Sequence, residues 1–303
     1  MWRIIDLSGE CYHLHVKSMN LNIKKNGMDI MSVPFQDIHS IIIHGRENTF
    51  SEAFFNFCLR FSIPVLFCND EHLPNGMLLP FYQHQDSANR FESQIKAKVP
   101  RQKQAWQRII QAKLIAQSMT LKERGKLQES KRLQVLSKKV LSGDSSNCEA
   151  IGAREYFEAL FGDDFSRRND TESVNGFLNY AYSIVRSCVA RAVCSCGLHP
   201  SISIFHSNRT NPYALVDDLM EPLRPIADMY VLQMLDELTE EEKDLTSKNK
   251  KKIIGMISIP VRFREQSYEF SGAVRMYVMD YLHFLESTSS EIKIPIMDIK
   301  TWQ

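Results

Sequence analysis

The pattern of hydrophobic residues changes once along the chain, near residues 82–87, and this change decides what the chain can fold into. Before it, turn residues separate short apolar runs such as Tyr12–Val16 and Ile41–His44, a pattern typical of strands. After it, apolar residues recur every three or four positions, as in amphipathic helices. The sequence therefore predicts an α+β chain. A small N-terminal β-sheet or sandwich-like domain at 1–81 is followed by a linker at 82–87 and a larger all-α domain at 88–303.

Two local signals shape the expected β domain. Asn26-Gly27 lies between two extended segments and predicts a tight hairpin, because both residues tolerate positive φ. Ala53–Phe61 predicts one short helix, after which Pro64–Cys68 returns as a strand. Little chemistry is expected in this part of the chain.

The first long helix of the second domain has an apolar stripe and basic flanks. The stripe consists of Trp106, Ile109, Ile110, Leu114 and Ile115, and the other faces are expected to hold Arg101, Lys103, Arg108 and Lys113. Further along, Thr171–Cys196 predicts the longest helix, and Phe263–Leu285 predicts a final amphipathic one.

Charge is distributed unevenly although the net charge is only +1. Residues 1–80 carry 6 Lys+Arg and 8 Asp+Glu, residues 81–145 carry 14 and 5, and residues 146–303 carry 17 and 23. A basic segment between two acidic ones favours an anionic polymer such as nucleic acid as a partner. The alternative is an ordinary solvated helix surface, and the sequence favours nucleic acid only modestly.

Composition narrows the cellular setting. Hydrophobic residues make up 44% of the 303 residues and charged residues 24%, as in globular proteins. No uninterrupted apolar stretch is long enough to cross a membrane, and the start MWRIIDLSGE lacks the apolar core of a signal peptide. Seven cysteines at irregular spacing indicate a reducing compartment. These features predict a cytoplasmic protein.

The stretch His206–Arg224 contains the densest set of reactive side chains. Asp218 and Glu221 are three residues apart, which places both on one helix face. Pro222 and Pro225 remove backbone donors and predict a kink there. A histidine, two acids and a bent backbone suggest a divalent-metal site. The alternative is an acidic surface helix that follows a loop, and the spacing alone does not decide between the two.

The sequence also predicts where the helix that carries Asp218 and Glu221 begins. Asn211 is expected to cap it, with Pro212 at its first position, because proline lacks the amide hydrogen that would be unpaired there.

A second acid, Glu149, lies at another expected helix start. Ser145, Ser146 or Asn147 is expected to cap this helix. Glu149 then falls in the first turn, where the positive end of the helix dipole favours a carboxylate. On the residues alone this structural interpretation of Glu149 is preferred.

Four motifs occur in an order and spacing that resemble a known family. They are E-x-x-G-A-R-x-Y-F at Glu149–Phe157, N-G-x-L-N-Y-A-Y at Asn175–Tyr182, G-L-H-P at Gly197–Pro200, and the His206–Pro225 stretch. Together they resemble the CRISPR-associated integrase, the metal-dependent endonuclease subunit of spacer acquisition. The opening Met-Trp-Arg and the length are similar to its type II branch. The resemblance covers essentially the whole chain.

The resemblance implies a catalytic metal site. Glu149, His206 and Glu221 stand at the positions of the family's metal ligands, and the expected cofactor is Mg²⁺ or Mn²⁺. Many branches carry aspartate where this chain has Glu221, so the ligand here is one methylene longer. Asp218 matches an acid near the site in some members and is expected to support it.

Several other residues are given supporting or DNA-binding roles. Asn208 and Arg224 are expected to fasten the loop or to support the ligands. Arg154, Arg167 and Arg168 are candidates for contacts with DNA phosphates, although each of them has a structural or solvent-exposed alternative.

The implied activity is insertion of captured DNA into a CRISPR array. The 3′-hydroxyl of a captured double-stranded fragment would attack a phosphodiester at the boundary of a repeat. The expected partners are a second copy of the chain and a small ferredoxin-like adaptation subunit, in the cytoplasm of a prokaryote. Two alternatives stay open: a general metal-dependent nuclease acting on branched or single-stranded nucleic acid, and a non-catalytic DNA-binding scaffold whose three ligands never converge.

Overall fold

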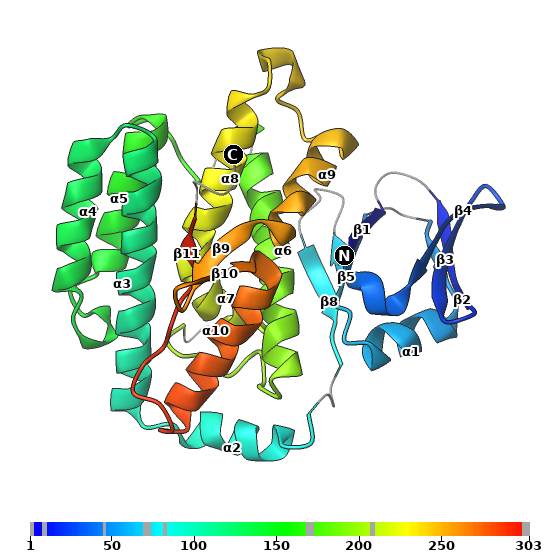
Figure 1. Ribbon diagram of the computed structural model, residues 1–303, viewed down its shortest axis with the longest axis horizontal. Helices are drawn as coiled ribbons and strands as arrows, with labels where there is room; N and C mark the ends of the chain where they lie inside the picture. Colours follow the sequence, from blue (N-terminus) through cyan, green and yellow to red (C-terminus); the bar gives the residue numbers. More distant parts are fainter. Residues whose placement is uncertain are drawn as a thin grey trace. The chain divides into compact units, whose positions relative to one another are not determined.

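The chain forms two compact units in a computed structural model, Met1–Gln85 and Asp86–Gln303 (Figure 1). The structure describes residues 3–7, 11–44, 47–68, 74–80, 84–167, 173–206 and 210–298. β-Sheets come first and a mostly helical part follows, which confirms the predicted fold class. The domain limits at 1–81 and 88–303 stay a prediction, and residues 81–83 of the expected linker lie outside the described residues.

Two four-stranded sheets build the N-terminal unit. One has the order β1-β5-β7-β8, with β1, β5 and β7 parallel and β8 antiparallel to β7; the other has the order β4-β3-β2-β6. The strands are β1 (Arg3–Leu7), β2 (Tyr12–Lys17), β3 (Asn20–Lys25), β4 (Met28–Pro34), β5 (Ile38–Ile43), β6 (Thr49–Phe50), β7 (Val65–Cys68) and β8 (Pro74–Leu78).

An apolar cluster holds this unit together. Leu14 and Ile23 of the second sheet, Ile41 of the first and Phe54 of helix α1 (Glu52–Arg60) are all buried in it. The predicted hairpin is confirmed, since β3 and β4 pair in an antiparallel manner around Asn26 and Gly27, which have φ of 51° and 77°.

The C-terminal unit is organised around α3 (Val99–Glu123), a helix of 25 residues. It packs against α4 (Leu127–Lys139) and α5 (Cys148–Phe161), which lie beside it in Figure 1. The other described helices of this unit are α2 (Ser87–Lys96), α6 (Ser173–Ser195), α7 (Ala214–Met220), α8 (Arg224–Asp236), α9 (Ser247–Ile254) and α10 (Phe270–Leu285). Its short 3₁₀ turns are η2 (Ser142–Asp144), η3 (Glu221–Leu223), η4 (Glu240–Glu242) and η5 (Gly255–Ser258), while η1 (Phe35–Asp37) belongs to the N-terminal unit.

A small sheet adds to the helices in this unit. It has the order β10-β9-β11 and consists of β9 (Pro260–Phe263), β10 (Gln266–Glu269) and β11 (Ile296–Met297). The long helix expected at Thr171–Cys196 is α6, and Thr171 and Glu172 lie outside the described residues. The final helix begins at Phe270 rather than Phe263, because Pro260–Phe263 pairs with Gln266–Glu269 as a hairpin.

The helix after the His206 loop begins later than predicted. It starts at Ala214, not at Pro212. The Asn211 side chain forms a local turn instead of a helix cap, since its Oδ1 accepts from the backbone amide of Tyr213 at 3.0 Å and its Nδ2 donates to Asp217 at 2.7 Å.

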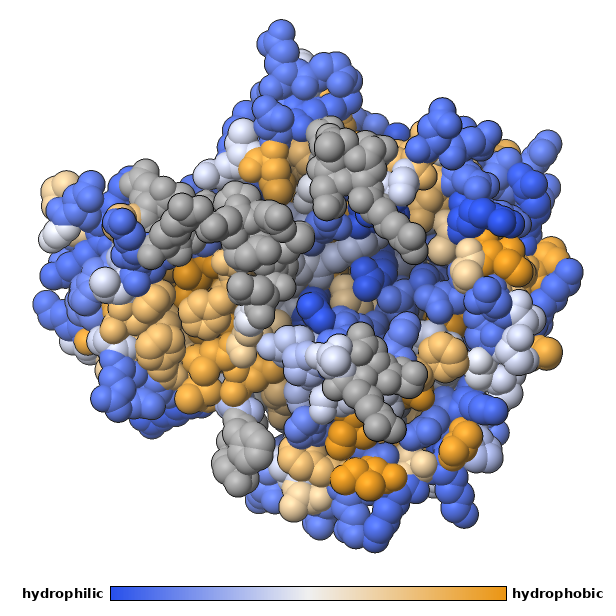
Figure 2. Space-filling model, turned by 180° about the vertical axis from the view of Figure 1, so that it is seen from behind, coloured by the Kyte–Doolittle hydropathy of each residue, from blue (hydrophilic) through white to orange (hydrophobic). Residues whose placement is uncertain are grey.

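The described helices include none that is both long enough and apolar enough to cross a membrane. The face of the molecule in Figure 2 carries hydrophilic residues over most of its area, with hydrophobic patches between them.

Candidate functional site

Glu149 is held at the start of α5 by an acid that precedes the helix. Asp144 accepts from the amides of Cys148 at 2.9 Å and of Glu149 at 3.0 Å. Asn147 precedes the helix in a left-handed conformation and makes no capping bond with its side chain. The prediction of Ser145, Ser146 or Asn147 as the cap was therefore wrong, because the two oxygens of Asp144 bond two adjacent free amides of the first turn.

Glu221 lies where the chain kinks between α7 and α8. The 3₁₀ turn Glu221–Leu223 separates the two helices and contains Pro222, so the predicted kink is present. Glu221 is buried, and Arg224 Nε donates to its Oε1 at 2.9 Å. Arg224 thus contacts Glu221 directly, and its supporting role in the site stays a prediction.

Lys113 of α3 bridges the two glutamates. Its Nζ lies 2.8 Å from Glu149 Oε1 and 2.5 Å from Glu221 Oε2. The expectation that Lys113 lies on an exposed basic face was wrong, since the residue is only 6% exposed. Its charge is balanced by the two carboxylates, and such pairing is what allows a lysine to be buried.

These charges act strongly on one another. Burial disfavours ionisation of Glu221, but the charges of Lys113 and Arg224 outweigh it and lower the pKa of Glu221 to about 2. Burial also opposes the charge of Lys113, and the nearby Glu221 and Glu149 more than compensate, so the pKa of Lys113 is raised. Glu221 and Lys113 are therefore both ionised at neutral pH.

His206 is oriented by Asp218. Its Nδ1 bonds Asp218 Oδ1, while Asp218 Oδ2 accepts from the amides of Ile204 at 2.6 Å and Phe205 at 2.9 Å. The hydrogen bond with Asp218 raises the pKa of His206 despite partial burial, and the charges of Asp218, Glu149 and Glu221 add to the effect. Holding Nδ1 in this way leaves Nε2 as the nitrogen for another contact, an arrangement common for metal-binding histidines.

The structure brings some predicted residues together and not others. Glu149 and Glu221 meet at one point, where Lys113 lies between them. Within the described residues, no three His, Cys, Asp or Glu side chains are grouped closely enough to hold a metal ion. Arg154 is 70% exposed at its side chain and pairs with Glu158 at 3.8 Å, so it lies on the surface. Asn208 and Arg168 lie outside the described residues.

A cavity of about 250 Å³ opens beside the two glutamates. Arg167 and Arg224 line it together with Tyr182, and their guanidinium groups lie 5.3 and 4.7 Å from the centre of the Tyr182 ring. Arg167 also donates to Asn175 and Asn179 of α6. Arg167, one of the candidate DNA contacts, is thus next to the site, although internal partners engage its guanidinium.

Asp228 also lines this cavity. It is buried and accepts hydrogen bonds from Tyr156 at 3.0 Å and Tyr182 at 2.5 Å. Burial raises the pKa of Asp228 to about 6, against the opposing effect of the hydrogen bonds from Tyr182 and Tyr156. The two hydroxyls fix the rings, and Tyr182 in turn positions Arg224 and Arg167.

The sequence interpretation missed Lys113, Asp144 and Asp228. A signal for Lys113 was available, because residues 106, 109, 110 and 113 follow helical spacing along the buried stripe. Asp228 had no comparable signal, since its tyrosine partners lie in other helices.

Part of the basic segment is engaged inside the unit. Arg101 donates to the backbone carbonyls of Phe284 at 2.8 Å and Ser289 at 2.7 Å. Arg124 pairs with Asp236 at the end of α8. These arginines attach the C-terminal segments to α3, so part of the positive charge of residues 81–145 is used inside the unit.

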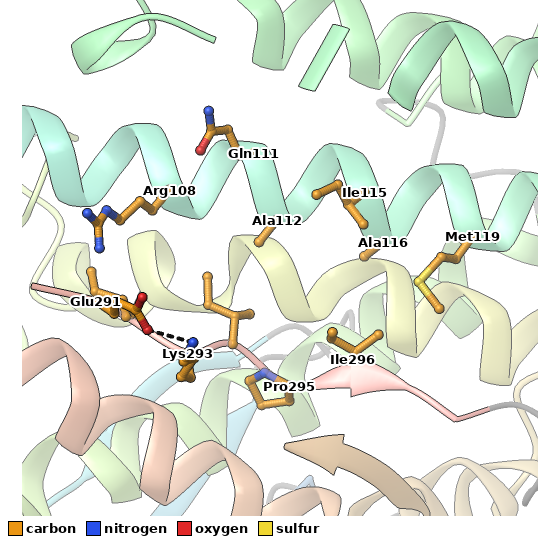
Figure 3. A pocket seen from close by; sticks show the side chains of 12 residues that line it. Arg108, Gln111, Ala112, Ile115, Ala116, Met119, Glu291, Lys293, Pro295 and Ile296 are labelled. Carbon is orange, nitrogen blue, oxygen red and sulfur yellow. Dashed lines mark ion pairs between the residues drawn. The ribbon is translucent and has the colours of Figure 1, made fainter. Parts of the chain in front are cut away.

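A second cavity of about 550 Å³ lies along α3, away from the glutamates (Figure 3). It is lined by Arg108, Ile115 and Met119 on the helix and by residues 291–296, where Lys293 pairs with Glu291 at 2.6 Å. None of the residues predicted for the site lies in it.

Residues 7–256 match the profile of the family described as CRISPR associated protein Cas1. The chain is 32% identical over 292 residues to the CRISPR-associated endonuclease Cas1 of Neisseria meningitidis serogroup C (strain 8013), covering 96% of this chain and 95% of that relative. The chain therefore belongs to the Cas1 family. The family expected from the motifs is confirmed, and the type II branch stays a prediction.

Two solved structures share the fold. A casposase bound to an integration product matches with a TM-score of 0.81 and 19% identity, covering 96% of this chain and 92% of that one. A chain of a Cas6-RT-Cas1–Cas2 complex matches with a TM-score of 0.75 and 18% identity, covering 95% of this chain and 35% of that one. These likenesses concern the fold of both units.

Proposed function

We propose that this chain is a divalent-metal-dependent DNA integrase and endonuclease of CRISPR spacer acquisition, with Glu149, His206 and Glu221 as its metal ligands. The observation that carries the proposal is that Glu149 and Glu221, from separate helical segments, converge on one cation, the ammonium group of Lys113. A protein that brings two carboxylates to one point needs a positive charge there.

The donor set fits Mg²⁺ or Mn²⁺. Carboxylate oxygens suit both ions, and an imidazole nitrogen suits Mn²⁺ better. Asp218 holds His206 by Nδ1, so Nε2 is the donor for the ion. A bound divalent ion would stabilise charge on a phosphate and activate an attacking oxygen.

The chain's own groups would place the DNA. Arg224 keeps Glu221 oriented, and Asp218 keeps His206 oriented. The main task of the protein is then to hold the 3′-hydroxyl of a captured fragment in line with a phosphate at the repeat boundary.

The names of the relatives support a partner as well as an activity. The matched relative is called an endonuclease, one matched structure contains an integration product, and another contains a second Cas subunit. We therefore place this chain in a cytoplasmic assembly with double-stranded DNA, a second copy of itself and a small ferredoxin-like adaptation subunit.

Strand transfer tests the site. The assay combines the purified chain, the partner subunit, a short duplex and a plasmid that carries a repeat, with Mn²⁺ or Mg²⁺. Glu149→Ala, His206→Ala and Glu221→Ala should each abolish joining and leave duplex binding nearly intact, because the site would lose a metal ligand. Glu158→Ala is the matched control: Glu158 is an exposed acid on the same helix as Glu149, and its loss should leave joining unchanged.

Two results would contradict the proposal. Full joining by His206→Ala would remove His206 from the site. Hydrolysis without joining, on the same oligonucleotides, would favour a general nuclease instead.

A further inference from the structure

The ammonium group of Lys113 lies between Glu149 and Glu221, the two acids that the proposed metal site would share. Its Nζ is within hydrogen-bond distance of one oxygen of each carboxylate. Among the described residues, no three His, Cys, Asp or Glu side chains are close enough together to hold a metal ion. A lysine and a divalent cation cannot both occupy one point between two carboxylates, since their like charges repel strongly at such distances.

A hydrogen-bond acceptor that Lys113 does not use lies one helical turn further along α3. Gln117 is 2% exposed, and among the described residues nothing hydrogen-bonds its side-chain carbonyl oxygen. Residues four apart share a helix face, and Lys113 and Gln117 both line the 250 Å³ cavity beside the glutamates. A buried acceptor without a donor is unfavourable, so this oxygen offers a binding position to an ammonium group.

We propose that Lys113 is a resident cation that exchanges places with the divalent metal ion. In the metal-free protein it bridges Glu149 and Glu221, offsets their charge together with Arg224, and holds the two carboxylates close to each other. When a metal ion binds, Lys113 swings into the cavity and donates to the carbonyl oxygen of Gln117. This inference rests on the proposed metal site, and it makes Lys113 and Gln117 positioning residues that set the affinity for metal.

Manganese binding tests the exchange without any DNA. Free Mn²⁺ is measured by electron paramagnetic resonance during a titration of the purified chain, and the thermal unfolding midpoint is followed in parallel. Lys113→Met keeps the shape of the side chain and removes the competitor, so Mn²⁺ should bind about tenfold more tightly. The midpoint without metal should fall, because the two carboxylates lose their shared cation.

Gln117→Leu should have the opposite effect. It removes the acceptor for the displaced ammonium, so Mn²⁺ should bind about tenfold more weakly. The double variant Lys113→Met with Gln117→Leu should bind Mn²⁺ like Lys113→Met alone, since Gln117 acts only through Lys113. Lys122→Met is the charge control: Lys122 is an exposed lysine on the same helix, and its loss should leave Mn²⁺ affinity unchanged.

The outcomes separate this inference from the proposed function. No Mn²⁺ binding by the unaltered chain would reject both. Binding by the unaltered chain, with equal or weaker binding by Lys113→Met, would reject the exchange and keep the metal site. If Lys113→Met does not fold, Gln117→Leu decides alone, and an unchanged affinity in that variant overturns the exchange.

Discussion

The two units bury different kinds of side chain. The described residues of the N-terminal unit bury an apolar cluster and few polar side chains, among them His39, Ser40 and the pair of His44 with Asp6 at 3.9 Å. The C-terminal unit buries many ionisable side chains, among them Lys113, Asp144, Asp218, Glu221 and Asp228. Both units use apolar packing for their cores, but only the second also removes several acids from water.

This difference in buried side chains matches different roles: the N-terminal unit has a mainly apolar core, and the C-terminal unit contains the candidate site. Transfer of an ion into a protein interior is unfavourable by several kcal/mol even after relaxation, and pairing compensates only if the geometry is good. The N-terminal unit incurs less of this penalty, since its core is mainly an apolar cluster and strand β5 is buried throughout its length. The C-terminal helices incur it around Lys113, where two carboxylates pair with one ammonium group.

Removal of one buried charge should therefore be the most damaging change. Glu221→Ala leaves Arg224 without its acid and Lys113 with only Glu149, so we expect a loss of about 3 to 5 kcal/mol in unfolding free energy. Ile41→Val in the N-terminal core is the comparison and should lose about 1 kcal/mol. Urea unfolding of both variants measures the difference, and similar losses would mean that the two interiors are energetically alike.

The pH dependence of stability tests the same contrast through Asp228. Its pKa is about 6 in the folded chain against an ordinary value of 3.8, so between these values the folded state holds a proton that the unfolded state releases. This stabilisation is complete below about pH 4 and is lost as the pH rises through 6, a fall of about 2 to 3 kcal/mol.

Asp228→Asn isolates this effect, because asparagine does not titrate. Urea unfolding of both proteins from pH 4 to 7, without metal, should show a fall that is about 2 to 3 kcal/mol smaller in the variant, which keeps only the contributions of other groups such as His206. Parallel pH curves would show that Asp228 does not carry it.

A smaller effect is expected from the close approach of α3 and α5. A Cβ at Gly152 would lie 2.1 Å from Leu114 Cδ2, so Gly152→Ala must move one helix or the leucine. We expect a loss of about 1 to 3 kcal/mol and weaker strand transfer, since Glu149 lies one turn before Gly152.

Gly176→Ala is the matched control for this change. Nothing lies within 4 Å of the added carbon in α6, so its greater helix propensity should stabilise the chain by up to about 1 kcal/mol. Equal effects of the two alanines on the thermal midpoint would contradict the tight contact at Gly152.

Local signals made much of this molecule predictable. Asn26-Gly27 specified a hairpin through backbone conformation, and Pro222 specified the kink through its missing amide hydrogen. Both effects act within a few residues. The motifs also identified the family, and the family made Glu149 a candidate ligand. From its neighbouring residues alone, Glu149 was interpreted as a carboxylate that the positive end of the helix dipole favours.

The features that the sequence did not predict depend on residues that are far apart in the sequence or on tertiary structure. Lys113 was expected to be solvated, as lysines usually are, and only its two distant acids explain why it is buried. The choice of Asp144 over three neighbouring cap candidates depends on the turn η2, which brings both of its oxygens to the first amides of α5. Such arrangements follow from tertiary structure rather than from local pattern.

The bridge at Lys113 has a consequence for the order of events during synthesis. Glu149 follows Lys113 by 36 residues and Glu221 follows it by 108. Contacts over such separations form only after the intervening chain has emerged and folded. A ribosome-bound chain that stops before Glu221 therefore lacks one of the two acids that Lys113 bridges, and under the proposed function it would also lack one ligand of the metal ion.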